Sequence, residues 1–198
     1  QRQMCIRDRY YKDTKIRKII GNINLFPNFV TLIVETNTVT RMKDLIITAV
    51  IKVYQYDELN EADQALVKTA KDATARSYSP YSHFSVGAAV LLGNGIVVTG
   101  TNQENAAYPS GLCAERTTLF YANSQYPDQP VVTLAVAART EKDFIDRPIP
   151  PCGACRQVIL ETEKRYGQPI RILLYGKECI YEIKNIGCLL YTSDAADE

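Results

Sequence analysis

Three cysteines in two groups constrain the fold of this chain more than any other feature of its sequence. A Cys-Ala-Glu group stands at residues 113–115, and a Pro-Cys-Gly-Ala-Cys group stands at residues 151–155. Each group opens a predicted helix, where unpaired N–H groups and the positive end of the helix dipole favour thiolates. A Cys-x-x-Cys pair on a first helical turn places two sulfurs on one side, which is a common half-site for zinc. The fold must therefore bring two helix N-termini together.

The number of ligands favours a catalytic zinc over a structural one. Cys113, Cys152 and Cys155 give three protein ligands, whereas a structural zinc normally has four. A metal with an open fourth position carries a water and lowers its pKa, and Glu115, two residues from a ligand, can reach that water as a proton shuttle. The alternative is a structural zinc with Cys179 as the fourth ligand, which would leave Glu115 without a purpose.

The remaining pattern predicts helices and strands in alternation between Met42 and Gly187. Gly-Asn-Gly at residues 93–95 predicts a hairpin. Three helices are predicted. The first starts after the N-cap candidates at 57–60 and ends at Pro80, and the other two cover residues 113–122 and 152–165. The predicted strands cover residues 86–92, 96–101, 131–138, 170–175 and 180–183. A hairpin followed by β-α-β-α-β crossovers gives a mixed sheet with helices on its faces, an α/β fold of three layers, α/β/α.

Charge is unevenly distributed along the chain. Residues 1–41 carry eight basic and three acidic side chains, residues 42–187 are close to neutral, and residues 188–198 carry three acidic side chains and no basic one. A basic arm on a neutral domain is one form of nucleic-acid or membrane tether. No apolar run approaches the roughly 18 residues that span a bilayer, which excludes a transmembrane helix.

Both ends of the chain are predicted to be translated adapter DNA. Met-Cys-Ile-Arg-Asp at residues 4–8 and Cys-Leu-Leu-Tyr-Thr-Ser at residues 188–193 fit the two strands of one DNA word, which resembles the transposon end used in sequencing-library preparation. On this hypothesis residues 1–41 are a non-native or disordered extension, residues 42–187 are the native domain, truncated at its C-terminus, and residues 188–198 are an adapter-derived tail. A genuine N-terminal extension over residues 10–41 remains the alternative.

Between about Asp57 and Ile183 the chain resembles the small, single-domain cytidine deaminases. The signature of zinc-dependent nucleobase deaminases is His- or Cys-x-Glu followed by Pro-Cys-x-x-Cys, and it is present here at residues 113–115 and 151–155. The stretches SPYSHFSVGAA at 79–89 and NQENAAY at 102–108, and the Arg-Gln pair after the last cysteine, carry the closer likeness. Cysteine at the first ligand position, where polynucleotide and deoxycytidylate deaminases usually have histidine, points to a free nucleoside as substrate.

The resemblance implies a role for each matching residue of the metal site. Cys113, Cys152 and Cys155 would hold one zinc ion per chain, and Glu115 would be the general acid and base. In the implied reaction Glu115 takes a proton from the zinc-bound water, the hydroxide attacks C4 of cytosine, and Glu115 passes the proton to N3 and helps ammonia leave. Three thiolates leave the site with a charge of about −1.

Two arginines are predicted to offset that charge. Arg116 and Arg156 each follow a cysteine ligand, and we expect both to donate hydrogen bonds to the sulfurs.

The resemblance also implies the substrate contacts. Asn102 and Glu104 would hold the ribose hydroxyls, Phe84 would pack against the base, and backbone groups around Ala114 would recognise the pyrimidine edge. Tyr108 would lie either near the sugar or at a subunit contact. The single histidine, His83, is interpreted as a loop or surface residue.

The predicted function is deamination of cytidine and deoxycytidine to uridine and deoxyuridine with release of ammonia, a reaction of pyrimidine salvage. Two alternatives stay open: a deaminase of another aminopyrimidine nucleoside such as blasticidin S, and a non-catalytic binding module stabilised by zinc. The expected partner is a small nucleoside and neither nucleic acid nor membrane. Cytoplasm is the expected compartment, because the thiolates must stay reduced.

The resemblance implies a homotetramer whose sites are completed by neighbouring subunits. Family members normally continue past the position of Leu190, and adapter-like residues replace that segment here. We therefore expect a weakened assembly.

Overall fold

The computed structural model describes residues 50–190, and the predictions made on residues 1–41 lie outside them. In chain order the elements are β1 (Ile51–Tyr54), α2 (Glu61–Ala73), β2 (Ser85–Leu92), β3 (Val97–Thr101), α3 (Ala114–Gln125), β4 (Val131–Arg139), α4 (Gly153–Tyr166), β5 (Arg171–Tyr175) and β6 (Ile180–Ile183). No helix among them is long and apolar enough to cross a membrane.

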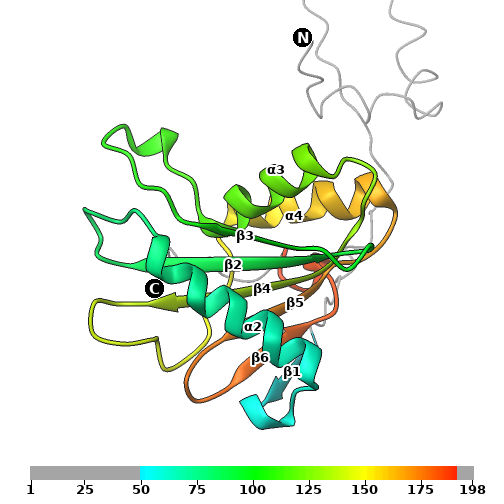
Figure 1. The fold of residues 1–198 in the computed structure, drawn as a ribbon, viewed down its shortest axis with the longest axis horizontal. Helices are drawn as coiled ribbons and strands as arrows, with labels where there is room; N and C mark the ends of the chain where they lie inside the picture. Colours follow the sequence, from blue (N-terminus) through cyan, green and yellow to red (C-terminus); the bar gives the residue numbers. More distant parts are fainter. Residues whose placement is uncertain (1–49, 191–198) are drawn as a thin grey trace, which may run out of the picture. The chain divides into compact units, whose positions relative to one another are not determined.

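The strands form one mixed sheet in the order β1-β6-β5-β4-β2-β3. Strands β4 and β5 run parallel, and each other neighbouring pair in this sheet is antiparallel. Helix α2 covers one face of the sheet, and α3 and α4 lie side by side on the other (Figure 1). The predicted three-layer α/β/α arrangement is confirmed.

Side chains that alternate along the central strands fill two separate cores. Ala89 of β2 and Ala137 of β4 belong to the core under α2, together with Val67 and Ala70 of that helix. Ala88, the next residue on β2, belongs to the core under α3 and α4. Because successive side chains of a strand point to opposite faces, one strand serves both cores. This explains why the central strands are apolar throughout, as expected for strands covered by helices on both sides.

The predicted elements are present, with two corrections. Strand β1 was not predicted: it pairs with β6 at the sheet edge, where Ile51 and Val53 remain exposed. Helix α2 begins after its N-cap Asn60, as predicted, but it ends at Ala73 and not at Pro80. The Thr74 hydroxyl donates to the Lys71 carbonyl, and a short 3-10 turn then leads the chain away.

The packed part of the chain continues beyond the predicted boundary at Gly187. Residues Ile186–Cys188 form a 3-10 turn, and Leu189 is buried in the core under α3 and α4. The Leu189 carbonyl accepts a hydrogen bond of 2.7 Å from Arg156 of α4. This packing needs only an apolar side chain and a carbonyl at position 189, so a residue translated from adapter DNA can supply it.

Two glycines let the helices approach the sheet closely. A Cβ added at Gly87 of β2 would lie 2.2 Å from the Ala70 carbonyl oxygen of α2, and one at Gly100 of β3 would lie 2.4 Å from Thr118 Oγ1 of α3. Since real Cβ atoms do not approach other atoms this closely, any larger residue would force the helix away from the sheet.

Gly87→Ala is therefore expected to lower the free energy of unfolding by about 1–3 kcal/mol, because the new methyl group collides with backbone of α2. Urea unfolding followed by far-ultraviolet circular dichroism measures the change. Ser124→Ala, on the exposed surface of α3, is the control and should stay within about 0.5 kcal/mol of wild type. An unchanged unfolding midpoint for Gly87→Ala would show that the sheet and α2 are not packed this closely.

Candidate active site

The three predicted ligand cysteines come together at the N-termini of α3 and α4. Cys113 is the N-cap of α3, Cys152 is the N-cap of α4, and Cys155 lies in the first turn of α4. All three Sγ atoms lie within 4.8 Å of one another. The separation is 3.7 Å between Cys113 and Cys152 and 3.4 Å between Cys152 and Cys155. Two segments far apart in sequence thus supply one sulfur cluster.

The topology of the sheet explains this convergence. Strand β2 is antiparallel to both β3 and β4, so the carboxyl ends of β3 and β4 lie on the same side of the sheet. Helix α3 follows β3 and helix α4 follows β4, and both helices therefore begin beyond these strand ends. The start of β2 lies on the same side, because Ser85 pairs with Arg139 at the end of β4.

The sulfur cluster fits zinc in both spacing and chemistry. A tetrahedral zinc with Zn–S bonds of about 2.3 Å places its sulfurs about 3.8 Å apart, close to the separations found here. Hydrogen bonding with Cys113 and with Cys155, and with N–H groups of the first turn of α4, lowers the pKa of the Cys152 thiol. The neighbouring thiols Cys113 and Cys152 raise the pKa of Cys155 instead. Only a cation lets three sulfurs this close all be thiolates.

No fourth ligand joins this cluster within residues 50–190. Cys179, the alternative fourth ligand, lies outside it, between β5 and β6. Three ligands leave an open position, which is the arrangement of a catalytic zinc.

Glu115 lies beside the sulfur cluster, one residue inside the N-terminus of α3. Its side chain is buried, and burial raises the pKa of the carboxyl above its ordinary value. The hydrogen bond with Cys152 is the main cause of the raised pKa of Cys113, and the charge of Glu115 adds to it. A buried carboxyl with an elevated pKa next to a metal-binding group is the arrangement expected of a group that accepts and releases protons.

The two arginines differ in their contacts. Arg116 Nη2 lies 3.9 Å from Cys113 Sγ and donates to the Gly111 carbonyl at 3.2 Å. Arg156 is buried, and it donates to the Pro151 carbonyl at 2.8 Å as well as to Leu189. Arg116 therefore contacts a ligand sulfur, and the bond from Arg156 to Pro151 holds the backbone just before Cys152. That both arginines offset the charge of the sulfurs stays a prediction.

The predicted sugar contacts lie at the end of β3 and hold the loop before β2. Glu104 Oε2 accepts hydrogen bonds from the backbone N–H groups of Tyr81 and Ser82, at 2.9 and 3.3 Å. Hydrogen bonds from Ser82 and Tyr81 lower the pKa of the Glu104 carboxyl. The Asn102 amide donates a hydrogen bond to the Phe84 carbonyl and accepts one from the Val86 N–H, on either side of Ser85. Phe84, the predicted base contact, is half-buried at the end of this loop.

One backbone bridge connects the sugar side with the metal side. Gln103 and Leu112 exchange hydrogen bonds of 2.8 and 3.0 Å. Since Gln103 lies between Asn102 and Glu104, and Leu112 precedes Cys113, the predicted sugar contacts are tied to the first zinc ligand.

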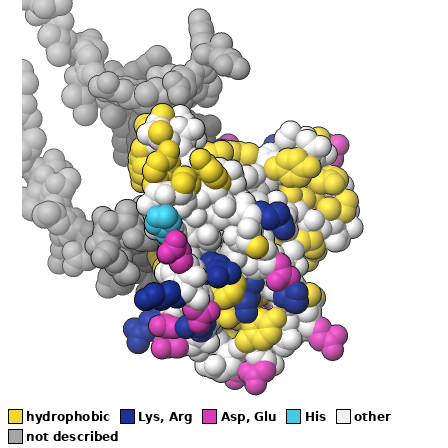
Figure 2. All heavy atoms as spheres, turned by 60° about the vertical axis from the view of Figure 1, so that its left-hand side comes forward, with side chains coloured by type: hydrophobic (Ala, Val, Ile, Leu, Met, Phe, Trp, Pro, Cys, Tyr) yellow, Lys and Arg dark blue, Asp and Glu magenta, His cyan; other side chains and the backbone are white. Residues whose placement is uncertain are grey.

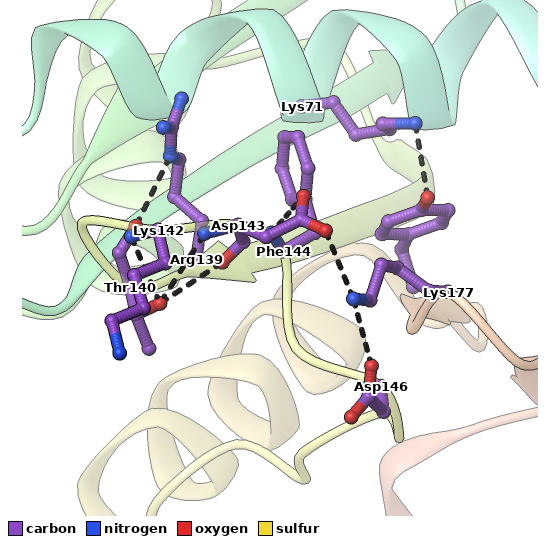
Figure 3. A network of polar contacts seen from close by, with 9 residues as sticks. Lys71, Arg139, Thr140, Lys142, Asp143, Phe144, Asp146 and Lys177 are labelled. Atoms are coloured by element: carbon purple, nitrogen blue, oxygen red, sulfur yellow. Dashed lines mark hydrogen bonds and ion pairs between the residues drawn. The ribbon is translucent and has the colours of Figure 1, made fainter.

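A second loop, which follows β4, reaches the loop before β2. Lys177 holds it by ion pairs of 2.9 Å with Asp143 and with Asp146 (Figure 3). From this fixed loop Glu141 reaches His83, with 3.2 Å between Oε1 and Nδ1. Figure 2 shows the single histidine of the chain against an acidic side chain at the surface. His83 is exposed, as predicted, and its backbone φ of 56° marks a tight turn just before Phe84.

Residues 60–166 match the protein family described as the cytidine and deoxycytidylate deaminase zinc-binding region. The chain belongs to the cytidine and deoxycytidylate deaminase family. It is 51% identical over 98 residues to the cytidine deaminase of Halalkalibacterium halodurans, covering 50% of this chain and 70% of that protein. It is 39% identical over 105 residues to a cytidine deaminase of Mycobacterium tuberculosis, covering 52% of this chain and 74% of that protein.

Solved structures of the deaminase family share this fold. The crystal structure of cytidine deaminase from Burkholderia pseudomallei superposes with a TM-score of 0.56 at 36% identity, covering 68% of this chain and 99% of that one. The crystal structure of cytidine deaminase from Mycobacterium tuberculosis gives a TM-score of 0.52 at 31% identity, covering 68% and 98%. The resemblance seen in the sequence motifs is confirmed.

Sequence reasoning missed two residues, one that contacts a predicted sugar-binding residue and one that holds the loop before β2. Ser77 donates to Asn102, and Glu141 holds His83. Ser77 lies only two residues before the recognised stretch at 79–89, but a serine there gives no signal by itself. Glu141 belongs to a loop whose course depends on Lys177, far away in sequence.

We expect the full chain to bind one zinc ion, and Cys152→Ala or Cys155→Ala to abolish this binding, because either change removes a sulfur from a three-ligand site. Metal content after dialysis, measured by atomic emission, checks the result. Cys179→Ala is the matched control and should retain the zinc. Loss of zinc in the Cys179 variant alone would contradict the three-sulfur assignment.

Proposed function

We propose that the chain catalyses the hydrolytic deamination of cytidine and deoxycytidine to uridine and deoxyuridine, with release of ammonia. One observation carries the proposal: a buried glutamate, Glu115, beside three cysteine sulfurs that leave one position of a zinc ion open. A metal site that served only stability would use a fourth protein ligand and would have no need of a buried carboxyl.

Cys113, Cys152 and Cys155 would hold the zinc, which supplies a Lewis acid that makes a water acidic enough to react near neutral pH. Glu115 accepts the proton of the attacking water. It delivers this proton to N3 of the base, then takes the remaining proton of the hydroxyl added at C4 and passes it to the amino group, so that ammonia leaves as the C4 carbonyl forms. Arg116, which reaches Cys113, offsets part of the negative charge of three thiolates.

The remaining residues would orient the nucleoside. Oε2 of Glu104 accepts hydrogen bonds from two backbone N–H groups, which leaves Oε1 to accept a hydrogen bond from a sugar hydroxyl. Asn102 has one N–H to donate to the sugar. Phe84 packs on the base, and backbone groups at Ala114, the first residue of α3, face the pyrimidine edge.

We also propose that the chain assembles as a homotetramer in the cytoplasm. Tyr108 is 91% exposed, and Phe120 and Tyr121 on the outer face of α3 are about half exposed. Figure 2 shows further hydrophobic side chains gathered at the surface of the described domain. Large hydrophobic side chains left exposed are typical of contact surfaces. In this assembly Tyr108 would lie at a subunit contact.

The domain division predicted from the sequence is likewise proposed, with the activity carried by residues 42–187 and the residues packed directly after them. A chain that begins at Met42 should deaminate cytidine as the full chain does. If deletion of residues 1–41 abolished turnover while zinc stayed bound, those residues would be part of the enzyme.

Glu115→Gln is expected to reduce cytidine turnover by about 10²- to 10⁴-fold, because the amide cannot accept and release the transferred protons. The fall in ultraviolet absorbance of cytidine, measured on the zinc-loaded full chain, gives the rate. Glu161→Gln, on the exposed surface of α4, is the matched control and should turn over cytidine at the wild-type rate.

Zinc content should be equal in both variants and in wild type. Full activity of Glu115→Gln would overturn the assigned role. A zinc-loaded wild-type chain that forms no uridine would overturn the proposed substrate.

A further inference from the structure

The side-chain amide of Asn102 makes three hydrogen bonds to its surroundings. Its Nδ2 donates to the Phe84 carbonyl at 2.9 Å, and its Oδ1 accepts from the Val86 N–H at 2.8 Å. Oδ1 also accepts from the Ser77 hydroxyl at 2.5 Å. The two backbone bonds decide which way the amide faces, because a backbone N–H can only donate and a carbonyl can only accept.

Counting protons and lone pairs leaves one group of this amide available. An amide oxygen has two lone pairs, and Ser77 and Val86 occupy both. The nitrogen has two hydrogens, and only one has an acceptor among residues 50–190, the Phe84 carbonyl. The second N–H of Asn102 is therefore the single hydrogen-bonding group that this side chain can offer to a ligand.

Ser77 is the end of a chain of hydroxyls. Its Oγ lies 3.3 Å from Ser79 Oγ, which lies 3.2 Å from Ser85 Oγ. Ser77 has one hydroxyl proton, and the short contact with the acceptor Oδ1 takes it. In the contact with Ser79 too, Ser77 is the donor, so two acceptors compete for this one proton, and the much shorter bond to Oδ1 holds it.

We propose that Ser77 is a positioning residue for the nucleoside, which fixes and polarises the Asn102 amide so that its remaining N–H meets one sugar hydroxyl. The inference rests on the proposed function, in which Asn102 contacts the sugar. Without the Ser77 hydroxyl, one lone pair of Oδ1 loses its partner and the amide plane is held only by the loop backbone. Removal of the Ser77 hydroxyl should therefore weaken sugar binding, which raises KM, and leave the chemistry at the base, and with it kcat, unchanged.

Steady-state kinetics of Ser77→Ala with three nucleosides test this role. With cytidine we expect kcat/KM to fall about 5- to 10-fold through a higher KM, the effect of losing one hydrogen bond. One of the two nucleosides 2′-deoxycytidine and 3′-deoxycytidine lacks the hydroxyl that Asn102 binds. With that nucleoside, Ser77→Ala should not lower kcat/KM. Ser77→Thr keeps a hydroxyl and should restore the cytidine values, and Ser124→Ala should equal wild type with all three.

The test separates a positioning role from a structural one. An equal loss on all three nucleosides, a loss in kcat alone, or no loss on cytidine would overturn the inference. If Ser77→Ala does not fold, Ser77→Gly takes its place and should show the same loss with the same dependence on the sugar hydroxyl, because it also lacks the hydroxyl that donates to Asn102. Absence of cytidine turnover in wild type would overturn the proposed function, and this inference with it, whereas normal turnover without a Ser77 effect would overturn the inference alone.

Discussion

The approach of two helix N-termini to one point is the constraint on which the rest of the site depends. Three sulfurs within 4.8 Å of one another repel as thiolates and need a cation to balance them. The sheet makes this approach possible, because β3 and β4 end at the same edge and each is followed by a helix. Close packing of α3 against Gly100 then fixes where its N-terminus, with Cys113 and Glu115, must lie.

The residues that would bind the sugar lie where β3 ends and β2 begins, and their hydrogen bonds to the backbone hold them in place. Glu104 and Asn102 each make two hydrogen bonds to the backbone of the loop before β2 or of the first residues of β2. This loop carries Phe84, and His83 in the loop is held by Glu141. The groups that would contact the nucleoside are therefore ordered before it binds, which lowers the conformational entropy that binding must overcome.

Much of this could be predicted from the sequence, because the deciding signals were local. The Cys-x-x-Cys spacing, the hairpin glycines and the apolar runs of β4 and β5 depend on neighbouring residues alone. Strand β1 could not be predicted, since it is short, half exposed and defined only by its pairing with β6. The partner of His83 depends on a loop fixed by Lys177. Such features follow from tertiary contacts that no local pattern contains.

We propose that three cysteine sulfurs hold a zinc ion and leave one position for the reacting water. X-ray absorption at the zinc edge of the zinc-loaded full chain measures the atoms around the metal. We expect three sulfur neighbours at about 2.3 Å and one oxygen neighbour at about 2.0 Å. Four sulfur neighbours would show a closed, structural site, and a shell of nitrogen and oxygen alone would show that the metal lies elsewhere in the chain.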